Sequence, residues 1–289
     1  MTDMMTRDDI RFSLELMDIR RGDTLLLHSA FTAIGPVEGG ADAVIDAFLD
    51  AIGEEGTLVM STLTGWFAPF DAATTPSAVG WLSEVFRRRP GVLRSLHPVH
   101  SVAAYGRNAA YITRDHDKCE TGCGEGTPYR KISELGGKAV LLGVDMDRNT
   151  TMHSMEEAID AKYLLTLEIP APTYIEDYPH KRFTLKKFPP GHRDFLSMTP
   201  YLRTHDLMVE GMIGAARVKV MDVRGMFDLG KSLMEADPLL FICRNEHCNS
   251  CHWSRRLYEG GAIDYARYRR IACKDPTCEI CVVEEDAHG

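Results

Sequence analysis

The chain has 289 residues, of which 44% are hydrophobic and 26% are charged. These proportions exclude collagen-like, low-complexity and wholly disordered chains. No apolar run approaches the ~20 residues that a membrane helix needs, and the charged N-terminus lacks the apolar block of a signal peptide. The formal net charge of −9 disfavours contact with the phosphates of nucleic acid. We therefore expect a cytoplasmic protein without a membrane or nucleic-acid partner.

Predicted strands and helices alternate along the first half of the chain. Short apolar runs, typical of strands buried on both faces, occupy residues 24–28, 57–61, 100–105 and 139–144. Apolar residues with helical spacing occupy residues 2–18, 41–51, 83–88 and 151–163. This order predicts the α/β class, with a mostly parallel sheet covered by helices.

The second half is less regular and contains a basic stretch, KRFTLKKFPPGHR, at residues 181–193. Runs of charge usually face solvent, so we expect a solvated loop or hairpin here. The alternative is a contact for an anionic group such as a phosphate. An apolar pattern returns over residues 207–221.

A glycine-bearing loop follows the first predicted strand, in the sequence LLLHSAFTAIGPVEGG at residues 25–40. Small residues let a ligand approach the backbone, and free N–H groups at the start of a helix suit a phosphate or pyrophosphate. The glycines match neither the ATP-type phosphate loop nor the nicotinamide fingerprint. The loop indicates either a phosphate-bearing ligand or an ordinary tight turn.

Two further segments carry polar side chains with possible roles in a site. His97 and His100 lie at the entrance of a strand, in the sequence RSLHPVHSVAAYG, and histidines in strands are usually structural. The turn CGEGTPY at residues 123–129 could hold the polar arm of a cofactor or could be an ordinary loop.

The strongest catalytic candidate lies in GVDMDRNTTMHSMEE, residues 143–157. His153 falls in the first turn of a predicted helix, and Glu156 follows three residues later on the same face. Ligands of open α/β sheets gather at the carboxyl ends of strands, where this segment begins. A histidine oriented by a carboxylate is a good general base near pH 7.

Together these segments resemble the aminoglycoside 3-N-acetyltransferase family, whose members use coenzyme A and lack the GNAT fold. The resemblance rests on LLHSAFTAIG, GTLVMST, RSLHPVHSVAAYG, GEGTPY and GVDMDRNTTMHSMEE, in that order. It covers residues 8–165 well and the remainder loosely. It implies an α/β/α sandwich that binds acetyl-CoA and acylates an amine by direct attack, without an acyl-enzyme.

The resemblance also implies roles for individual residues. His153 would be the general base, with Glu156 beside it. Residues along the pantetheine and pyrophosphate of acetyl-CoA would be His28, Ser29, Phe31, Thr32, Gly35 and Thr127. We expect the acceptor to be an amine of an amino sugar or a related small molecule, and the protein to be a monomer or homodimer. The alternative is a catalytically idle scaffold or small-molecule-binding protein.

Three departures from the family pattern concern the cofactor and the substrate. Ala30 stands where the family has a second serine, and Thr127 replaces a serine but keeps its hydroxyl. The loop GWFAPFD, residues 65–71, has one carboxylate, Asp71, where antibiotic-modifying members have more. Its aromatic residues point to a less charged or more aromatic amine.

Six of the eight cysteines lie between Cys243 and Cys281. A reducing compartment disfavours disulfides, and two C-x-x-C pairs predict a zinc site whose ligands are Cys248, Cys251, Cys278 and Cys281. His247 and His252 could substitute, and an iron–sulfur cluster or chance composition are the alternatives. We expect an acetyltransferase-like domain over residues 1–242 and a cysteine-rich extension over residues 243–289.

Overall fold

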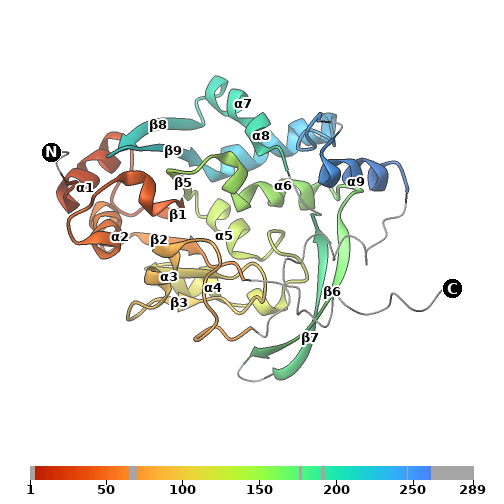
Figure 1. Ribbon diagram of the computed structural model, residues 1–289, viewed down its shortest axis with the longest axis horizontal. Helices are drawn as coiled ribbons and strands as arrows, with labels where there is room; N and C mark the ends of the chain where they lie inside the picture. The colour runs from red at the N-terminus through yellow and green to blue at the C-terminus, as the bar shows by residue number, and fades with distance from the viewer. Residues whose placement is uncertain (1–3, 65–69, 176–177, 190–192, 246, 262–289) are drawn as a thin grey trace.

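The computed structural model describes residues 4–261, apart from 65–69, 176–177, 190–192 and 246. At its centre is a seven-stranded sheet in the order β3-β4-β2-β1-β5-β9-β8, with helices on both faces (Figure 1). A separate two-stranded sheet, β6 and β7, projects from this body as a long hairpin (Figure 1). The expected α/β/α sandwich is confirmed.

Parallel pairing is confined to the middle of the main sheet. Strand β1 (Thr24–Ser29) pairs in parallel with β2 (Thr57–Ser61) on one side and β5 (Lys138–Leu142) on the other. The flanking strands pair antiparallel, and they are β3 (Leu93–Arg94), β4 (Val102–Gly106), β8 (Met208–Ile213) and β9 (Ala216–Asp222). The apolar pattern over residues 207–221 is thus a hairpin, which needs no crossover helix.

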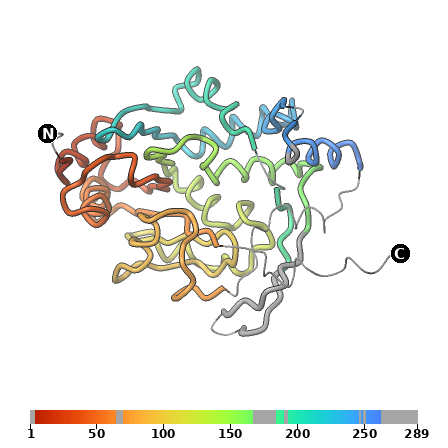
Figure 2. The backbone as a smooth tube through the Cα atoms, in the orientation of Figure 1, coloured from red at the N-terminus to blue at the C-terminus, as the bar shows by residue number. Residues whose placement is uncertain are grey.

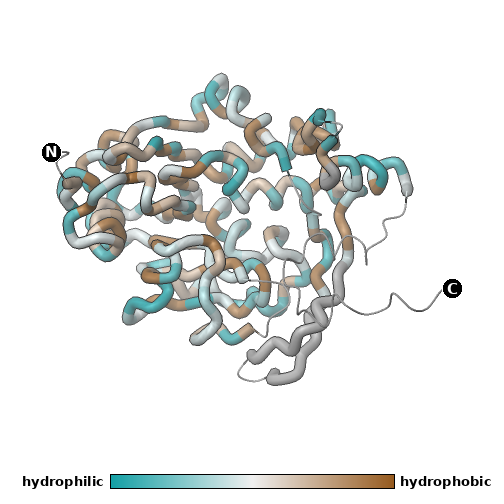
Figure 3. Tube along the Cα trace, in the orientation of Figure 1, coloured by the Kyte–Doolittle hydropathy of each residue, from teal (hydrophilic) through white to brown (hydrophobic). Residues whose placement is uncertain are grey.

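Successive side chains of β1 enter two different cores. Leu25 and Leu27 pack on one face of the sheet, and Leu26 packs on the other. The first core is completed by α1 (Arg7–Leu16), α2 (Gly40–Ile52) and α3 (Trp81–Arg87). Burial on both faces explains why the strand is an unbroken apolar run, and hydrophobic segments gather along the central strands in Figure 3.

The second core lies beneath the helices that lead to the site. Its residues come from α4 (Ala109–Thr113), α5 (Pro128–Glu134), α6 (His153–Ala158), α7 (Thr199–Thr204), α8 (Val223–Ala236) and α9 (Asn249–Tyr258). Cys251 of α9 is one of its buried members. The first residues of the predicted cysteine-rich extension therefore pack on the main body, while residues 262–289 lie outside the described part.

The helix predicted over residues 151–163 is shorter than expected. It begins as a 3₁₀ turn, Thr150–Met152, and continues as α6 for six residues. Asp160 has a left-handed φ of 52°, and the N–H of Ala161 donates to the carbonyl oxygen of Glu156, so the helix ends there. The short helix places His153 at its first residue.

The basic stretch belongs largely to the hairpin of β6 (Leu165–Ile175) and β7 (Tyr178–Phe188). The hairpin interpretation of residues 181–188 is confirmed by the pairing of β6 with β7 (Figure 1). The tube in Figure 2 shows the rest of the body in the same orientation. Among the described residues, no helix combines the length and apolar character that a membrane crossing requires.

Gly143 and Gly136 provide a matched test of packing beside the strand ends. Their φ angles are 67° and 66°, but a Cβ on Gly143 would lie 2.5 Å from the Cβ of Ala33, whereas one on Gly136 would meet nothing within 4 Å. We expect Gly136→Ala to lower the free energy of unfolding by about 1–2 kcal/mol through backbone strain alone. Gly143→Ala should cost about 1–3 kcal/mol more, because it also overpacks the loop. Urea denaturation measures both, and equal losses would contradict the packing argument.

Candidate active site

A cavity of about 460 Å³ opens where the parallel strands end. β1 contributes His28 and Ser29, β2 contributes Ser61, and Val144 follows β5 closely. His153 of α6 lines the same cavity, as do Leu27, Leu63, Ala78, Val79, Ser83, Asp147, Arg148, Asn149, Thr150 and Phe195. The cavity therefore has the position that open α/β sheets usually give to their ligands.

His153 and Glu156 form a hydrogen-bonded pair at this cavity. The Nδ1 atom of His153 lies 2.5 Å from Oε2 of Glu156, and the ring of Phe195 meets the imidazole edge to face at 5.0 Å. The imidazole keeps 19% of its surface exposed, whereas the Glu156 side chain is fully buried. The predicted three-residue spacing thus brings the two groups together.

Two residues that the sequence did not single out hold the Glu156 carboxylate. Arg193 donates from Nε to Oε1 of Glu156, and Tyr163 donates its hydroxyl to the same oxygen at 2.9 Å. The Arg193 guanidinium also stacks on the Tyr163 ring, 4.7 Å from its centre. Arg193 is the last residue of the basic stretch at residues 181–193. The alternative interpretation of that stretch, a contact with an anionic group, was the sequence signal that could have found Arg193. The anion is a carboxylate of the protein itself.

The charge of Arg193 decides the protonation state of Glu156. Burial alone would raise the carboxyl pKa, but Arg193 and the hydrogen bond from His153 outweigh burial and hold the pKa below its ordinary value. An ionised Glu156 accepts a hydrogen bond from a proton-bearing Nδ1 of His153. The lone pair of His153 then lies on Nε2, so this nitrogen can accept a proton.

His28 is the second histidine at the cavity. Burial lowers its pKa to about 4, so its ring is neutral near pH 7. Its Nε2 atom is buried and has no hydrogen-bond partner among the described residues. Ser29 lies beside it, while Phe31, Thr32 and Gly35 follow in the 3₁₀ turn η1 (Phe31–Ile34) and its C-cap without lining the cavity.

Thr127 is placed differently from the expectation. It is fully buried, does not line the cavity, and donates its hydroxyl to the carbonyl oxygen of Gly124 at 2.6 Å. Thr127 is the residue before α5, so this hydroxyl closes the turn that starts the helix. The cofactor contact expected for Thr127 stays a prediction.

His97 and His100, the other two candidate histidines, are both buried. His97 accepts hydrogen bonds at Nδ1 from the backbone N–H groups of Val99 and His100, at 3.1 and 2.9 Å. Burial, followed by the neighbouring His116, holds the pKa of His97 well below its ordinary value. Burial lowers the pKa of His100 to about 3. Neither residue lines the cavity that contains His153.

The loop expected to distinguish the substrate is partly described. Trp66 and Phe67 lie outside the described residues. The carboxylate of Asp71 accepts hydrogen bonds from the backbone N–H groups of Ala73 and Thr74, both at 2.8 Å. Phe70 is buried beneath the guanidinium of Arg94. The side chains of Asp71 and Phe70 therefore make contacts within the protein that hold this loop in place.

A larger hollow of about 1030 Å³ lies near the other side of α6. Its lining mixes cationic and acidic side chains and includes Arg130, Lys131 and Glu157, but it does not include His153 or His28. Volume alone would favour this hollow as the active site. The chemistry favours the smaller cavity, because the paired histidine lies there.

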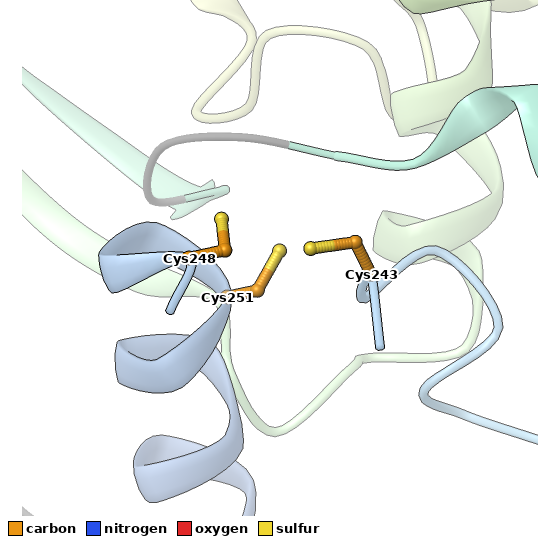
Figure 4. Close-up of side chains that lie close together, drawn as sticks. All are labelled: Cys243, Cys248 and Cys251. Carbon is orange, nitrogen blue, oxygen red and sulfur yellow. The ribbon is translucent and has the colours of Figure 1, made fainter. Parts of the chain in front are cut away.

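Three cysteines form a separate group at the start of α9. The sulfur atoms of Cys243, Cys248 and Cys251 all lie within 4.8 Å of one another (Figure 4). Burial, together with the neighbouring sulfur of Cys243, raises the pKa of Cys251 to about 12. Cys248 and Cys251 were predicted as ligands, and Cys243 was not; Cys278 and Cys281 lie outside the described residues. His247 and His252 are exposed and do not belong to the group.

The buried pair can be tested through stability. Arg193→Met should lower the free energy of unfolding by about 3–5 kcal/mol at pH 7, because it leaves Glu156 buried without its cation. The folded-state pKa of Glu156 lies below its ordinary value of 4.5, so its stabilising effect is present above about pH 4.5 and is lost as pH falls through the folded pKa. The difference from the wild type should therefore shrink in acid.

The control for this variant is Arg203→Met, which breaks an exposed bidentate pair with Glu210. Exposed pairs contribute little to stability, so this variant should unfold almost as the wild type does. Urea denaturation between about pH 3.5 and 7 compares the two. A loss in Arg193→Met no greater than in the control would contradict the role given to the buried pair.

Comparisons with known proteins place the chain in one family. The family model described as aminoglycoside 3-N-acetyltransferase matches residues 26–235. A relative from Salmonella sp, aminoglycoside N(3)-acetyltransferase III, is 34% identical over 192 residues, which are 58% of this chain and 67% of the relative. Aminoglycoside N(3)-acetyltransferase VII of Streptomyces paromomycinus is 28% identical over 267 residues, 80% of this chain and 92% of the relative. The chain spans about two thirds of the length of several type III relatives.

Solved structures share most of the architecture. The apoenzyme of aminoglycoside acetyltransferase AAC(3)-IVa has a TM-score of 0.81 and 29% identity, and covers 89% of this chain and 99% of its own. A variant of that enzyme with a histidine changed to alanine, in complex with a gentamicin, has a TM-score of 0.81, 28% identity and coverage of 89% and 98%. The binary complex of AAC-IIIb with CoASH has a TM-score of 0.72, 26% identity and coverage of 81% and 97%. The chain belongs to the aminoglycoside 3-N-acetyltransferase family, a family of acyltransferases.

Proposed function

We propose that this protein transfers an acetyl group from acetyl-CoA to an amino group of an aminoglycoside or related amino sugar, with His153 as general base. The observation that carries the proposal is the pairing of His153 with a buried, ionised Glu156 at a cavity formed by strand ends. Such a pair fixes the tautomer of the imidazole and stabilises it once it is protonated.

The relatives support the choice of substrates. The matched curated proteins are named as aminoglycoside N(3)-acetyltransferases. One similar structure holds a gentamicin and another holds CoASH. The structure with gentamicin carries a histidine-to-alanine change, which is consistent with a histidine that matters for turnover.

In the proposed reaction, Nε2 of His153 accepts one proton from the attacking amine nitrogen. The nitrogen forms a bond to the thioester carbonyl carbon, and the bond from that carbon to the CoA sulfur breaks. The sulfur leaves as a thiolate, and the imidazolium of His153 can return the proton to it. Glu156 stays ionised throughout, because Arg193 and Tyr163 keep it so and the carboxylate stabilises the transient positive charge.

Acetyl-CoA would lie across the end of β1. His28 offers a neutral, buried Nε2 without a partner among the described residues, and Ser29 lies beside it at the cavity. Phe31, Thr32 and Gly35 follow in the turn at the same strand end, so they would accompany the remainder of the cofactor. The cavity volume of about 460 Å³ suits part of such a ligand and not all of it.

Removal of the base should separate turnover from binding. His153→Ala should lower the rate of CoA release on the best amine by about 10²–10⁴-fold. Its acetyl-CoA affinity should stay within a few-fold of wild type, since a base acts chiefly in the transition state. Glu156→Gln should lower the rate less, because it leaves the imidazole in place.

The controls for this experiment are His100→Ala and the surface variant His205→Ala, each checked by thermal melting. Amines for the screen should include aminoglycosides, simple amino sugars and aromatic amines. Wild-type turnover in His153→Ala, or a collapse only in His100→Ala, would show that another residue is the base. Acetyl transfer to none of these amines would favour the idle binding protein instead.

Cofactor binding provides an independent prediction. Saturating acetyl-CoA should raise the melting temperature of the wild type, since a ligand that binds only the folded state stabilises it. His28→Ala should weaken binding by roughly 10-fold in titration calorimetry, the effect of one lost hydrogen bond. His205→Ala should bind as the wild type does. An unchanged melting temperature and no heat of binding for the wild type would rule out the cofactor.

A further inference from the structure

The sulfur atoms of Cys243, Cys248 and Cys251 lie close enough together to bind one metal ion. Its sulfur atoms come from Cys248, the N-cap of α9, from Cys251 in the first turn of that helix, and from Cys243, which precedes both (Figure 4). Cys251 is buried, and Cys243 and Cys248 are half-buried. The three side chains point toward one another from two separate stretches of backbone (Figure 4).

The spacing of the sulfur atoms suits a tetrahedral ion. A zinc–sulfur bond of about 2.3 Å places the sulfur atoms of a tetrahedral site about 3.8 Å apart. The observed sulfur atoms lie within 4.8 Å of one another, so small side-chain rotations would bring them to that distance. A disulfide, by contrast, needs about 2.05 Å and would leave the third sulfur without a function. No disulfide joins the three cysteines.

The same helix reaches the catalytic pair. Ser254 lies one turn after Cys251 on α9, is buried, and accepts a hydrogen bond from Nη1 of Arg193 at 3.2 Å. Arg193 in turn donates to Glu156, which holds His153. Arg255, the next residue of α9, donates to the carbonyl oxygen of Cys243. The start of α9 therefore connects the cysteine group to the active site.

We propose that Cys243, Cys248 and Cys251 bind one zinc ion, and that this ion fixes α9 so that Ser254 positions Arg193 against Glu156. Each thiol releases its proton as the ion binds. One coordination position remains for a fourth donor, from the protein or from water. Ser254 and Arg193 are positioning residues for the base, so the second half of this inference rests on the proposed function.

Metal content tests the first half without any assay of activity. Protein purified without added metal should contain about one zinc per chain. After exchange, cobalt should give the intense near-ultraviolet absorption of thiolate coordination. Cys251→Ser should lose most of the zinc, while Cys119→Ser, a half-buried cysteine outside the group, should keep it. Below ~0.2 zinc per chain in the wild type, with the thiols titrating or joined in a disulfide, the site is overturned.

Removal of zinc from the wild type by a chelator tests the site without a substitution, so the test does not depend on whether Cys251→Ser folds. Zinc removed from the wild type by a chelator should lower the melting temperature, and added zinc should restore it. A chelated protein that melts as the untreated protein does would also overturn a structural site.

The link to catalysis has its own variants. Ser254→Ala should keep its zinc and its acetyl-CoA affinity, yet lower kcat about 3–10-fold and shift the pH at which kcat reaches half its maximum. Ser254→Thr, which keeps the hydroxyl, should restore kcat and the profile. The zinc-depleted wild type should show the same altered profile. Full zinc content with unchanged kcat and pH profile in Ser254→Ala would refute the positioning role and leave the metal site standing.

Discussion

The pairing of Arg193 with Glu156 is the interaction on which the rest of the site depends. A buried carboxylate is costly unless it is paired, and an uncharged Glu156 would no longer hold Nδ1 of His153 in its proton-bearing form. Glu157, the next residue, shows what burial does where no such guanidinium offsets it, because burial raises its pKa to about 8. Two adjacent glutamates thus have opposite protonation tendencies, and the position of a single guanidinium separates them.

The mixed sheet explains where that pair had to lie. Parallel pairing in the main sheet joins the three central strands, so their carboxyl ends meet side by side at one edge. The strands on either side extend the sheet, and the carboxyl ends of their nearest members, β4 and β9, lie at the opposite edge. His28, Ser61 and the loop before His153 therefore converge through strand direction alone, although they are far apart in the chain.

Much of the fold and part of the site could be predicted from the sequence. The central strands are continuous apolar runs because both their faces are buried, and His153 and Glu156 are helical neighbours, so local spacing sufficed for each. Arg193, Tyr163 and Ser254 could not be found in this way, since their roles arise from contacts between distant segments. Thr127 was assigned to the cofactor from its motif, and the structure shows that its hydroxyl is used within a turn. Cys243 was missed because it stands outside the C-x-x-C spacing.

The β6–β7 hairpin has a consequence for how such a protein can diversify. Glu156 precedes β6 and Arg193 follows β7, so their ion pair joins the two chain segments that lead into and out of the hairpin. The entropy of closing a loop grows slowly with length, by roughly 0.6 kcal/mol for each doubling. Insertions, deletions or exchanges at the end of the hairpin far from this pair would therefore leave the ion pair in place. The hairpin is a module that evolution or an engineer can rebuild while the contacts among His153, Glu156 and Arg193 stay unchanged.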